Sequence, residues 1–251
     1  MVVPAYNEEG YIDNCLESLM QQEITPDEIL VINNNSTDRT VAIAKKFPVR
    51  IVNEKEQGTI QARNRGFNEA QYDIIARTDA DTIVPSDWIK KIKKSFQDKK
   101  LIALSGPSYY YDLPEVVQTS EWPSKAAFQS YAGILKQILR HDCLYGPNMA
   151  LRKSSWEKVK EQVCLNNKDV HEDVDLAVHL APLGKIIFDY DLVVRSSFRR
   201  FKKFKPYFEY PYRMFKGFSK HKITNMKQNG TKLVKKIVAK AFSPMETYKN
   251  E

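Results

Sequence analysis

Residues 73–84, DIIARTDADTIV, carry two aspartates that bracket a single alanine at the end of an apolar run. In an extended chain alternate side chains point to the same side, so Asp79 and Asp81 would lie together. Two neighbouring carboxylates repel each other unless a cation lies between them. The pair therefore indicates a cation site, and the alternative is a strand end at which both carboxylates face water.

The elements that must position these aspartates follow an α/β pattern. Short apolar runs alternate with amphipathic stretches, which is typical of βαβ units and a largely parallel sheet. We expect strands in five segments: 1–6, 28–33, 49–54, 72–78 and 101–106. The predicted helices of this half are 12–20, 41–47 with Ser36 as its cap, 59–67 after Gly58, and 87–96 after Ser86.

The second half of the chain is less regular. We expect a loop over 109–117, a helix over 124–140, a helix over 171–184 that ends at Gly184, and a strand over 185–194. Gly146 and Pro147 predict a tight turn.

Polar residues follow three of the predicted strands. In an open α/β sheet the ligand crevice lies beyond the carboxyl ends of the strands, so these groups should converge. No GxGxxG or GxxxxGK[ST] phosphate loop occurs, which argues against a dinucleotide enzyme or a P-loop NTPase. A diphosphate held at this edge would need a metal ion instead. The converging residues are 4–8, Asn33, Asn34, Asn35 and 79–81.

Composition narrows the class of protein. The chain has 251 residues and 42% apolar content, which suits one large globular domain with or without an appendage. Three widely spaced cysteines form neither a disulfide framework nor a zinc motif, and this favours a reducing compartment. No signal peptide and no apolar stretch of about 18 residues is present, so we expect a soluble or peripheral protein.

The net charge of +8 is concentrated near the C-terminus. Residues 1–194 contain 23 Lys and Arg and 28 Asp and Glu, a net charge of −5, whereas residues 195–251 contain 16 and 3, a net charge of +13. Aromatic and basic residues interleave over 195–222, and 231–242 has the pattern of a basic amphipathic helix. This C-terminal segment predicts either docking on an anionic membrane surface or packing on the preceding domain.

Six segments of the chain form a recognisable set: VVPAYNEEGYI, VINNNSTDRT, GTIQARNRGF, RTDADT, GPNMALRKSSWE and HEDVDL. In this order and spacing they resemble a family 2 glycosyltransferase with the GT-A fold. The resemblance implies a mostly parallel sheet flanked by helices over residues 1–200, with a donor-binding half at about 1–106 and an acceptor half at about 107–200. A basic helical extension over 201–251 would follow.

The resemblance also implies which residues bind a nucleotide-diphosphate sugar. The family often has Asp-Asp where this chain has Asn33-Asn34, and because Asn both donates and accepts hydrogen bonds, the preferred base stays open. For both Asn33 and Asn34 the alternative is a simple turn before a helix. The residues implied for the nucleoside are Pro4, Ala5, Tyr6, Glu8 and Asn34.

In the family the DxD segment holds Mn²⁺ or Mg²⁺ against the diphosphate, since such cations prefer oxygen ligands. The resemblance implies that Asp81 is the direct metal ligand, that Asp79 lies nearer the ribose or binds through water, and that Ala80 lines the site between them. Arg63 would assist with charge, and its alternative is a solvated helix arginine.

Inverting transfer also needs a base that takes the proton of the acceptor hydroxyl. The resemblance of HEDVDL to the family's ED motif nominates Asp173, with Glu172 orienting it or the acceptor and Asp175 in reserve. The alternative is that these carboxylates only complement a helix dipole. A lone His171 beside them is more typical of a structural residue than of a metal ligand.

The predicted function is metal-dependent inverting transfer of a sugar from a nucleotide-diphosphate donor to a hydroxyl of a glycan or lipid-linked acceptor. The predicted location is the cytoplasm or the inner face of the cell membrane. One alternative is a polyprenyl-phosphate glycosyltransferase, whose anionic acceptor needs no base and leaves Asp173 unexplained. Another is a nucleic-acid-binding module that uses the basic C-terminus, which leaves the acidic residues 1–194 without a role.

Overall fold

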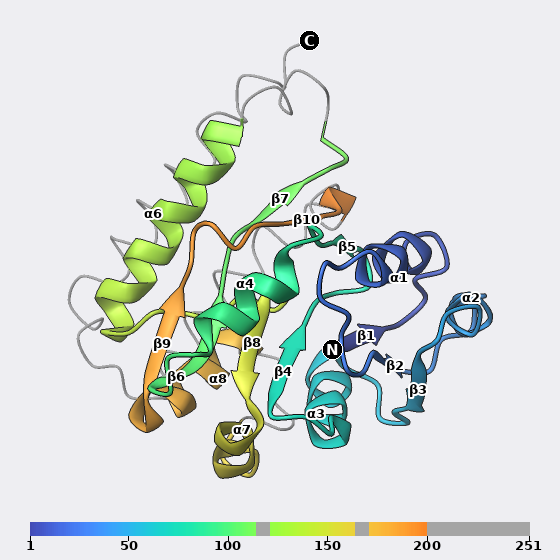
Figure 1. The fold of residues 1–251 in the computed structure, drawn as a ribbon, viewed down its shortest axis with the longest axis horizontal. Helices are drawn as coiled ribbons and strands as arrows, with labels where there is room; N and C mark the ends of the chain where they lie inside the picture. The colour runs from blue at the N-terminus through green and yellow to red at the C-terminus, as the bar shows by residue number, and fades with distance from the viewer. Residues whose placement is uncertain (114–120, 164–170, 200–251) are drawn as a thin grey trace.

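A seven-stranded sheet with the order β3-β2-β1-β4-β8-β6-β9 forms the centre of the computed structural model, which describes residues 1–113, 121–163 and 171–199 (Figure 1). All neighbouring pairs are parallel except those of β8 with β4 and β6, so the predicted largely parallel α/β sheet is confirmed. Its strands are β1 (Val2–Ala5), β2 (Leu30–Asn33), β3 (Arg50–Asn53), β4 (Ile74–Arg77), β6 (Leu101–Ser105), β8 (Met149–Arg152) and β9 (Lys185–Phe188).

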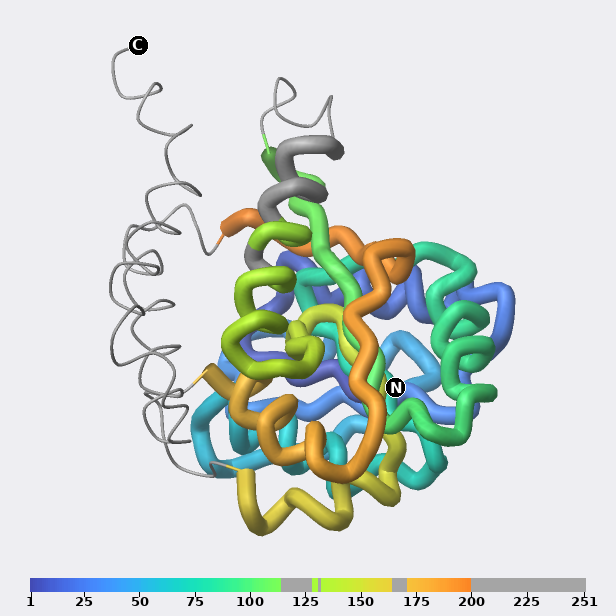
Figure 2. Tube along the Cα trace, turned by 90° about the vertical axis from the view of Figure 1, so that its left-hand side faces the viewer, coloured from blue at the N-terminus to red at the C-terminus, as the bar shows by residue number. Residues whose placement is uncertain are grey.

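Helices cover both faces of this sheet, which explains why its central strands are apolar except at their last positions, such as Asn33, Arg77 and Arg152. One face packs against α1 (Ile12–Met20), α2 (Thr40–Ala44) and α4 (Trp88–Ser95). The other face packs against α3 (Thr59–Glu69), α7 (Lys153–Val159) and α8 (Glu172–Leu180). The helix α6 (Glu121–Leu139), yellow-green in Figure 2, packs through its C-terminal half on α8 and β9.

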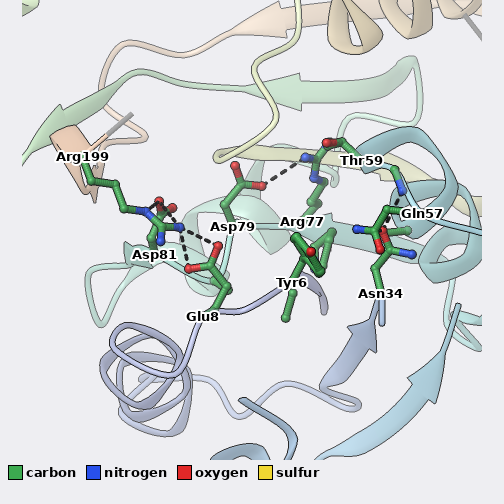
Figure 3. A pocket seen from close by; sticks show the side chains of 14 residues that line it. Tyr6, Glu8, Asn34, Gln57, Thr59, Arg77, Asp79, Asp81 and Arg199 are labelled. Carbon is green, nitrogen blue, oxygen red and sulfur yellow. Dashed lines mark hydrogen bonds and ion pairs between the residues drawn. The ribbon is translucent and has the colours of Figure 1, made fainter. Parts of the chain in front are cut away.

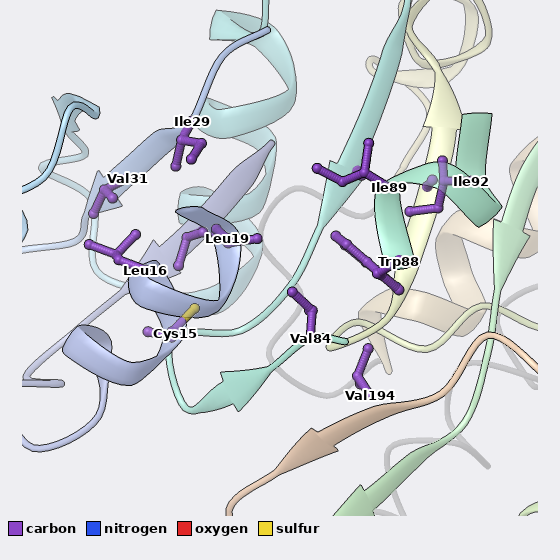
Figure 4. Close-up of a cluster of buried hydrophobic side chains, with 14 of the residues drawn as sticks. Cys15, Leu16, Leu19, Ile29, Val31, Val84, Trp88, Ile89, Ile92 and Val194 are labelled. Carbon is purple, nitrogen blue, oxygen red and sulfur yellow. The ribbon is translucent and has the colours of Figure 1, made fainter. Parts of the chain in front are cut away.

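Strand alternation separates the two cores. In β1, Val3 belongs to the first core and Val2 to the second, because successive side chains of a strand point to opposite faces. Figure 4 shows the first core, in which α1 contributes Leu16 and Leu19 beside Trp88 of α4. The expected helix over 12–20 is confirmed, and its apolar residues Ile12, Cys15, Leu16 and Leu19 are buried, whereas Met20 is exposed.

A second, three-stranded sheet joins segments that are distant in sequence. It consists of β5 (Thr82–Ile83), β10 (Val194–Ser196) and β7 (Ser108–Tyr110), with β10 in the middle. Buried hydroxyl groups connect the three strands, since Ser196 Oγ lies 2.9 Å from Thr82 Oγ1 and 2.7 Å from Ser108 Oγ. This small sheet fixes the chain after β10 beside the segment that follows Asp81.

Several local predictions are wrong. The expected strand 185–194 is two strands in different sheets, because the chain turns at Asp189, whose carbonyl and carboxylate accept the N–H groups of Leu192 and Asp191. The expected loop at 109–117 begins as strand β7, since it has β10 as a partner. Ser36 does not cap α2, which starts only at Thr40; its first N–H binds the carboxylate of Asp38.

Other elements differ less from expectation. The helix expected over 171–184 ends at Leu180 and continues as a short 3₁₀ turn, Ala181–Leu183, before Gly184. The strand β8 and the helix α7 were not predicted. The predicted basic extension over 201–251 lies outside the described residues. Within the part of the chain that is described, no helix has the length and apolar character needed to cross a bilayer.

Candidate active site

The strand order reverses between β1 and β4, and this is where an open α/β sheet forms a ligand crevice. Along β1 the backbone N–H and C=O groups of successive residues point alternately toward β2 and β4. The carbonyls of Met1 and Ala5 bind β2, whereas the carbonyl of Val2 accepts Thr78 N–H, so the backbone groups of Val2 and Pro4 face β4. Only Val2 pairs with β4, so the missing N–H of Pro4 costs no ladder bond. Beyond Pro4 the two strands separate, and the gap opens a pocket.

This pocket contains the residues nominated for the nucleoside and the metal ion. Figure 3 shows Arg199, Asp81 and Glu8 at one end, and Asn34, Gln57 and Thr59 at the other. Tyr6, half exposed, lies between the two ends. Arg63 and the carboxylates nominated on α8, Glu172, Asp173 and Asp175, do not line it. Asn7, Asn33 and Asn35, which were expected to converge at this edge, do not line it either. The lining residues are Pro4, Ala5, Tyr6, Glu8, Asn34, Gln57, Gly58, Thr59, Ala62, Arg77, Asp79, Ala80, Asp81 and Arg199.

The sequence predicted that the two aspartates lie on an extended strand, and this prediction is wrong. Residues 79–82 form a turn in which Thr82 N–H donates to the carbonyl of Asp79 at 3.0 Å. Both carboxylates still line the pocket, but each has a guanidinium partner of its own: Asp79 pairs with Arg77 at 3.1 Å and Asp81 with Arg199 at 3.0 Å. Separate arginines therefore neutralise the two carboxylates in this structure.

Arg199 occupies the acidic end of the pocket. Its Nε donates to Asp81 Oδ2 at 3.0 Å and its Nη2 reaches both carboxylate oxygens of Glu8 at 2.5 Å. The guanidinium also lies 4.2 Å from the ring centre of Tyr11, a cation–π distance. Its backbone is held close by, because Ser197 N–H donates to the carbonyl of Asp81 at 3.1 Å.

The opposite end of the pocket is built from amide groups. Asn34 is almost fully buried, and its Nδ2 donates to the carbonyls of Glu54 and Glu56 at 3.1 and 2.7 Å. Its Oδ1 accepts the backbone N–H of Gly58 at 2.8 Å and Gln57 Nε2 at 3.3 Å. The amide thus fastens the loop before α3 to the end of β2. Asn33 makes the turn expected as its alternative role, since its Oδ1 accepts Ser36 N–H at 3.0 Å.

Behind the pocket wall lies a buried charge cluster. The guanidinium of Arg77 contacts Glu172 Oε1 at 2.9 Å and Asp173 Oδ1 at 3.5 Å as well as Asp79. Asp173 also accepts the backbone N–H of Gly146 at 2.8 Å, so the predicted turn at 146–147 touches the nominated base. Arg77 is the only described residue that both lines the pocket and contacts Asp173 through its side chain.

Arg63 belongs to this cluster and is not the solvated helix arginine offered as its alternative. Its side chain is fully buried, and its Nη1 donates to the carbonyl of Glu172 at 2.9 Å and lies 4.0 Å from that carboxylate. The rest of its guanidinium donates to Asn64. Asp175 is buried one helical turn from His179, whose Nδ1 lies 3.8 Å from its carboxylate.

Burial and charge separate the two carboxylates at the start of α8. Burial opposes ionisation of Glu172, but Arg77 and Arg63 outweigh it and lower the pKa of that carboxyl. Burial and the neighbouring Glu172 raise the pKa of Asp173, although Arg77 and His171 act in the opposite direction. A carboxyl with a raised pKa beside one with a lowered pKa is the arrangement expected of a general base with a fixed neighbour.

The donor set at the pocket fits a hard divalent cation that brings other ligands with it. Among the described residues no group of three or more His, Cys, Asp or Glu could enclose a metal ion. Mg²⁺ and similar ions, however, bind through one or two carboxylates and complete their shell with phosphate and water oxygens. Asp79 and Asp81 offer such carboxylates, with side chains 17% and 8% exposed.

Gln57, Arg77 and Arg199 line the pocket but were not nominated from the sequence. Arg77 was detectable in principle, because a charge at the last position of a buried strand needs a partner. Arg199 carried no such signal, since ten basic residues crowd the segment 195–222 and nothing in the sequence distinguishes one of them.

Comparison with known proteins agrees with this geometry. The family model described as "Glycosyl transferase family 2" matches residues 1–159. A glycosyltransferase of Escherichia coli K12, YibD, is 38% identical over 169 residues, which cover 63% of this chain and 45% of the relative. A poly-beta-1,6-N-acetyl-D-glucosamine synthase of Staphylococcus aureus is 28% identical over 151 residues, covering 58% and 35%. Both matches span less than half of the relative's length.

A solved structure supports the fold. The mannosyltransferase PcManGT from Pyrobaculum calidifontis, in complex with GDP-Man and Mn²⁺, superposes with a TM-score of 0.71 and 19% sequence identity. The match covers 100% of this chain and 75% of that one. The predicted GT-A architecture, a mostly parallel sheet flanked by helices, is confirmed for the described residues.

Proposed function

Because this chain belongs to glycosyl transferase family 2, we propose that it transfers a sugar from a nucleotide-diphosphate sugar to a hydroxyl of a glycan or lipid-linked acceptor, with inversion at the transferred carbon. One observation carries the proposal: a single pocket at the β1/β4 switch point holds amide groups at one end and carboxylates at the other, with the aromatic ring of Tyr6 between them (Figure 3). A nucleoside and a metal-bound diphosphate need these two environments.

The pocket suggests how the donor would lie. The nucleoside would occupy the amide end, between Asn34 and the central Tyr6 and next to Pro4 and Ala5. Since the Asn34 amide already binds the loop 54–58, a base would be recognised by groups that this loop presents, such as Gln57, as well as by Asn34 itself. The diphosphate would then lie toward Asp79, Ala80 and Asp81.

A divalent ion, Mn²⁺ or Mg²⁺, would be held by Asp81 and Asp79 at the acidic end, with diphosphate oxygens completing its shell. When bound, it would stabilise the charge that develops on the departing diphosphate. The complex of PcManGT with GDP-Man and Mn²⁺ supports this assignment.

We assign Arg199 two successive partners. In the free protein its guanidinium neutralises Glu8 and Asp81, as the hydrogen bonds described above indicate. With a divalent ion on Asp81, the guanidinium would be released to the diphosphate, an anion that arginine binds well. Glu8 would remain as the carboxylate that holds the arginine near the donor.

Asp173 would act as the general base. Its raised pKa suits proton abstraction, and its Oδ2 is fixed by Gly146 N–H while its Oδ1 faces Arg77. Glu172, ionised between two arginines, would hold the cluster in place. Arg63 would act through Glu172 rather than through the donor.

The experiment is donor binding followed by transfer. The purified chain is heated with UDP- and GDP-sugars, with and without Mn²⁺, and the melting temperature is recorded. A donor present at about 100 times its dissociation constant stabilises by about 2.7 kcal/mol, which raises Tm by about 5 to 10 °C for a domain of this size. Asp81→Asn should abolish the Mn²⁺-dependent part of the shift, and Asp27→Asn, on the surface, serves as the control.

Transfer is then measured with the donor that binds, and the anomeric configuration of the product is read by NMR. Failure of every nucleotide sugar to raise Tm with any divalent ion would refute the proposed function. Retention of configuration, or full turnover in EDTA, would refute the inverting or the metal-dependent part alone.

A further inference from the structure

Arg77 is a charged residue at the end of a buried strand, and its side chain is only 2% exposed. Its guanidinium contacts three carboxylates. Nη2 donates to Asp79 Oδ1 at 3.1 Å, and Nη1 donates to Glu172 Oε1 at 2.9 Å and lies 3.5 Å from Asp173 Oδ1. One carboxylate belongs to the pocket and the other two to the start of α8, so a single cation bridges two parts of the site.

Gly146 packs closely against the guanidinium of Arg77. A Cβ on Gly146 would lie 3.0 to 3.1 Å from the guanidinium carbon and nitrogens, so a larger residue would crowd Arg77. The N–H of the same glycine donates to Asp173 Oδ2. The 146–147 turn therefore packs against the guanidinium of Arg77 and binds the carboxylate of Asp173.

Arginine suits this position better than lysine. Its planar fork carries five N–H donors and can bind carboxylates along two edges at once, whereas a lysine ammonium acts as a point charge. Within a buried cluster the pull of each carboxylate on the guanidinium affects the others, because an unbalanced buried charge is costly. A change at Asp173 should thus be felt at Asp79.

We propose that Arg77 is a positioning residue that couples the donor-side carboxylate Asp79 to the base Asp173, so that the occupancy of one site sets the geometry of the other. This inference rests on the proposed function, in which Asp79 belongs to the metal and donor site and Asp173 is the base. The inference adds to that function the coupling of Asp79 to Asp173 through Arg77.

A double-mutant cycle tests the coupling. The dissociation constant of Mn²⁺ with UDP or GDP is measured for the wild type, Asp173→Asn, Arg77→Lys and the double variant. In the wild type, Asp173→Asn lets the guanidinium bind Asp79 more tightly, so Mn²⁺–nucleotide affinity should fall roughly threefold or more. In the Arg77→Lys background the same change should have less than about half that effect, because the lysine contacts one carboxylate at a time.

The chain offers a matched control for this arginine. Arg50 also bridges two carboxylates, Glu28 at 2.7 Å and Glu69 at 3.0 Å, but it lies on β3 away from the pocket. Arg50→Lys should change neither kcat nor KM for the donor. Arg77→Lys should lower kcat and raise KM together, because it disturbs both the base and the donor-side carboxylate.

Gly146→Ala keeps the test decisive if Arg77→Lys does not fold, since it displaces the guanidinium without changing any charge. It should likewise reduce the effect of Asp173→Asn on Mn²⁺–nucleotide affinity. Additive effects in both backgrounds would overturn the coupling while leaving the proposed function intact. A wild type that binds no Mn²⁺–nucleotide at all would instead overturn the proposed function, and the coupling with it.

Discussion

The position of Arg199 predicts that its replacement changes the affinities for two ligands in opposite directions: Mn²⁺ alone should bind more tightly, and the Mn²⁺–nucleotide-sugar complex more weakly. Its guanidinium binds Asp81 and Glu8, whose side chains are 8% and 12% exposed, while its own side chain is 26% exposed. Hydrogen bonds to charged groups at such partly buried sites contribute about 1.5 to 3 kcal/mol each. A divalent ion that takes Asp81 must break at least one of them.

We therefore expect Arg199→Gln to bind Mn²⁺ without nucleotide roughly tenfold to hundredfold more tightly than the wild type, since about 1.4 kcal/mol corresponds to a factor of ten. The same variant should bind the Mn²⁺–nucleotide-sugar complex more weakly, because the guanidinium no longer reaches the diphosphate. Free Mn²⁺ is measured by electron paramagnetic resonance during a titration, and donor affinity by calorimetry.

A nearby arginine controls for the change in net charge. Arg39 pairs with Glu9 at 3.0 Å on the surface, with 81% of its side chain exposed, and lies outside the pocket. Arg39→Gln removes the same charge and should leave Mn²⁺ affinity nearly unchanged. If Arg199→Gln binds Mn²⁺ no more tightly than Arg39→Gln does, the reasoning that the guanidinium competes for the cation position is wrong.

Three further predictions concern the base, the core and the C-terminus. Asp173→Asn should lower kcat by ~10² or more, with donor affinity changed far less. The wild-type rate should rise with pH through a pKa above the ordinary aspartate range, since burial and Glu172 raise the pKa of this carboxyl. A wild-type rate that stays level across that range would contradict the assignment. Gly66→Ala should destabilise the fold by about 1 to 3 kcal/mol in urea unfolding, because its Cβ would meet Val2 Cγ1 at 2.3 Å. The full chain should sediment with acidic liposomes in a salt-sensitive way while a chain ending at Gly230 should not, since the tail carries the basic amphipathic pattern; equal recovery of both in the supernatant would end the membrane proposal.

The sheet was predictable because its signals are local. Buried strands of this kind are largely apolar, so runs such as 28–33 and 72–78 stand out without knowledge of their partners. The nominated residues at the ends of β1, β2 and β4 converge because strand direction alone brings them to one edge. Strands of two or three residues, such as β5 and β10, lack such a signal and form through pairing between distant segments, β10 with both β5 and β7.

The charge partners were not predictable for a different reason. The 79–82 turn, rather than an extended strand, decides where the two carboxylates point, and a turn of this kind depends on where the chain goes next. Arg199 is 118 residues from Asp81, and Glu172 is 95 residues from Arg77. Side-chain contacts at such separations follow from the assembled fold and leave no spacing rule in the sequence.

Arg199 changes how the charge of the chain should be interpreted. By composition, the basic segment that begins at residue 195 looks like an attachment to an acidic domain. Arg199, the last described residue of this segment, instead lines the pocket, because β10 pairs with β5 directly after Asp81 and places Arg199 beside the carboxylates. At least part of the C-terminal basicity therefore balances the donor site, and a truncation that probes membrane docking must leave β10 and Arg199 in place. A chain that ends at Gly230 meets this condition, so that a loss of liposome binding there could not be attributed to a damaged pocket.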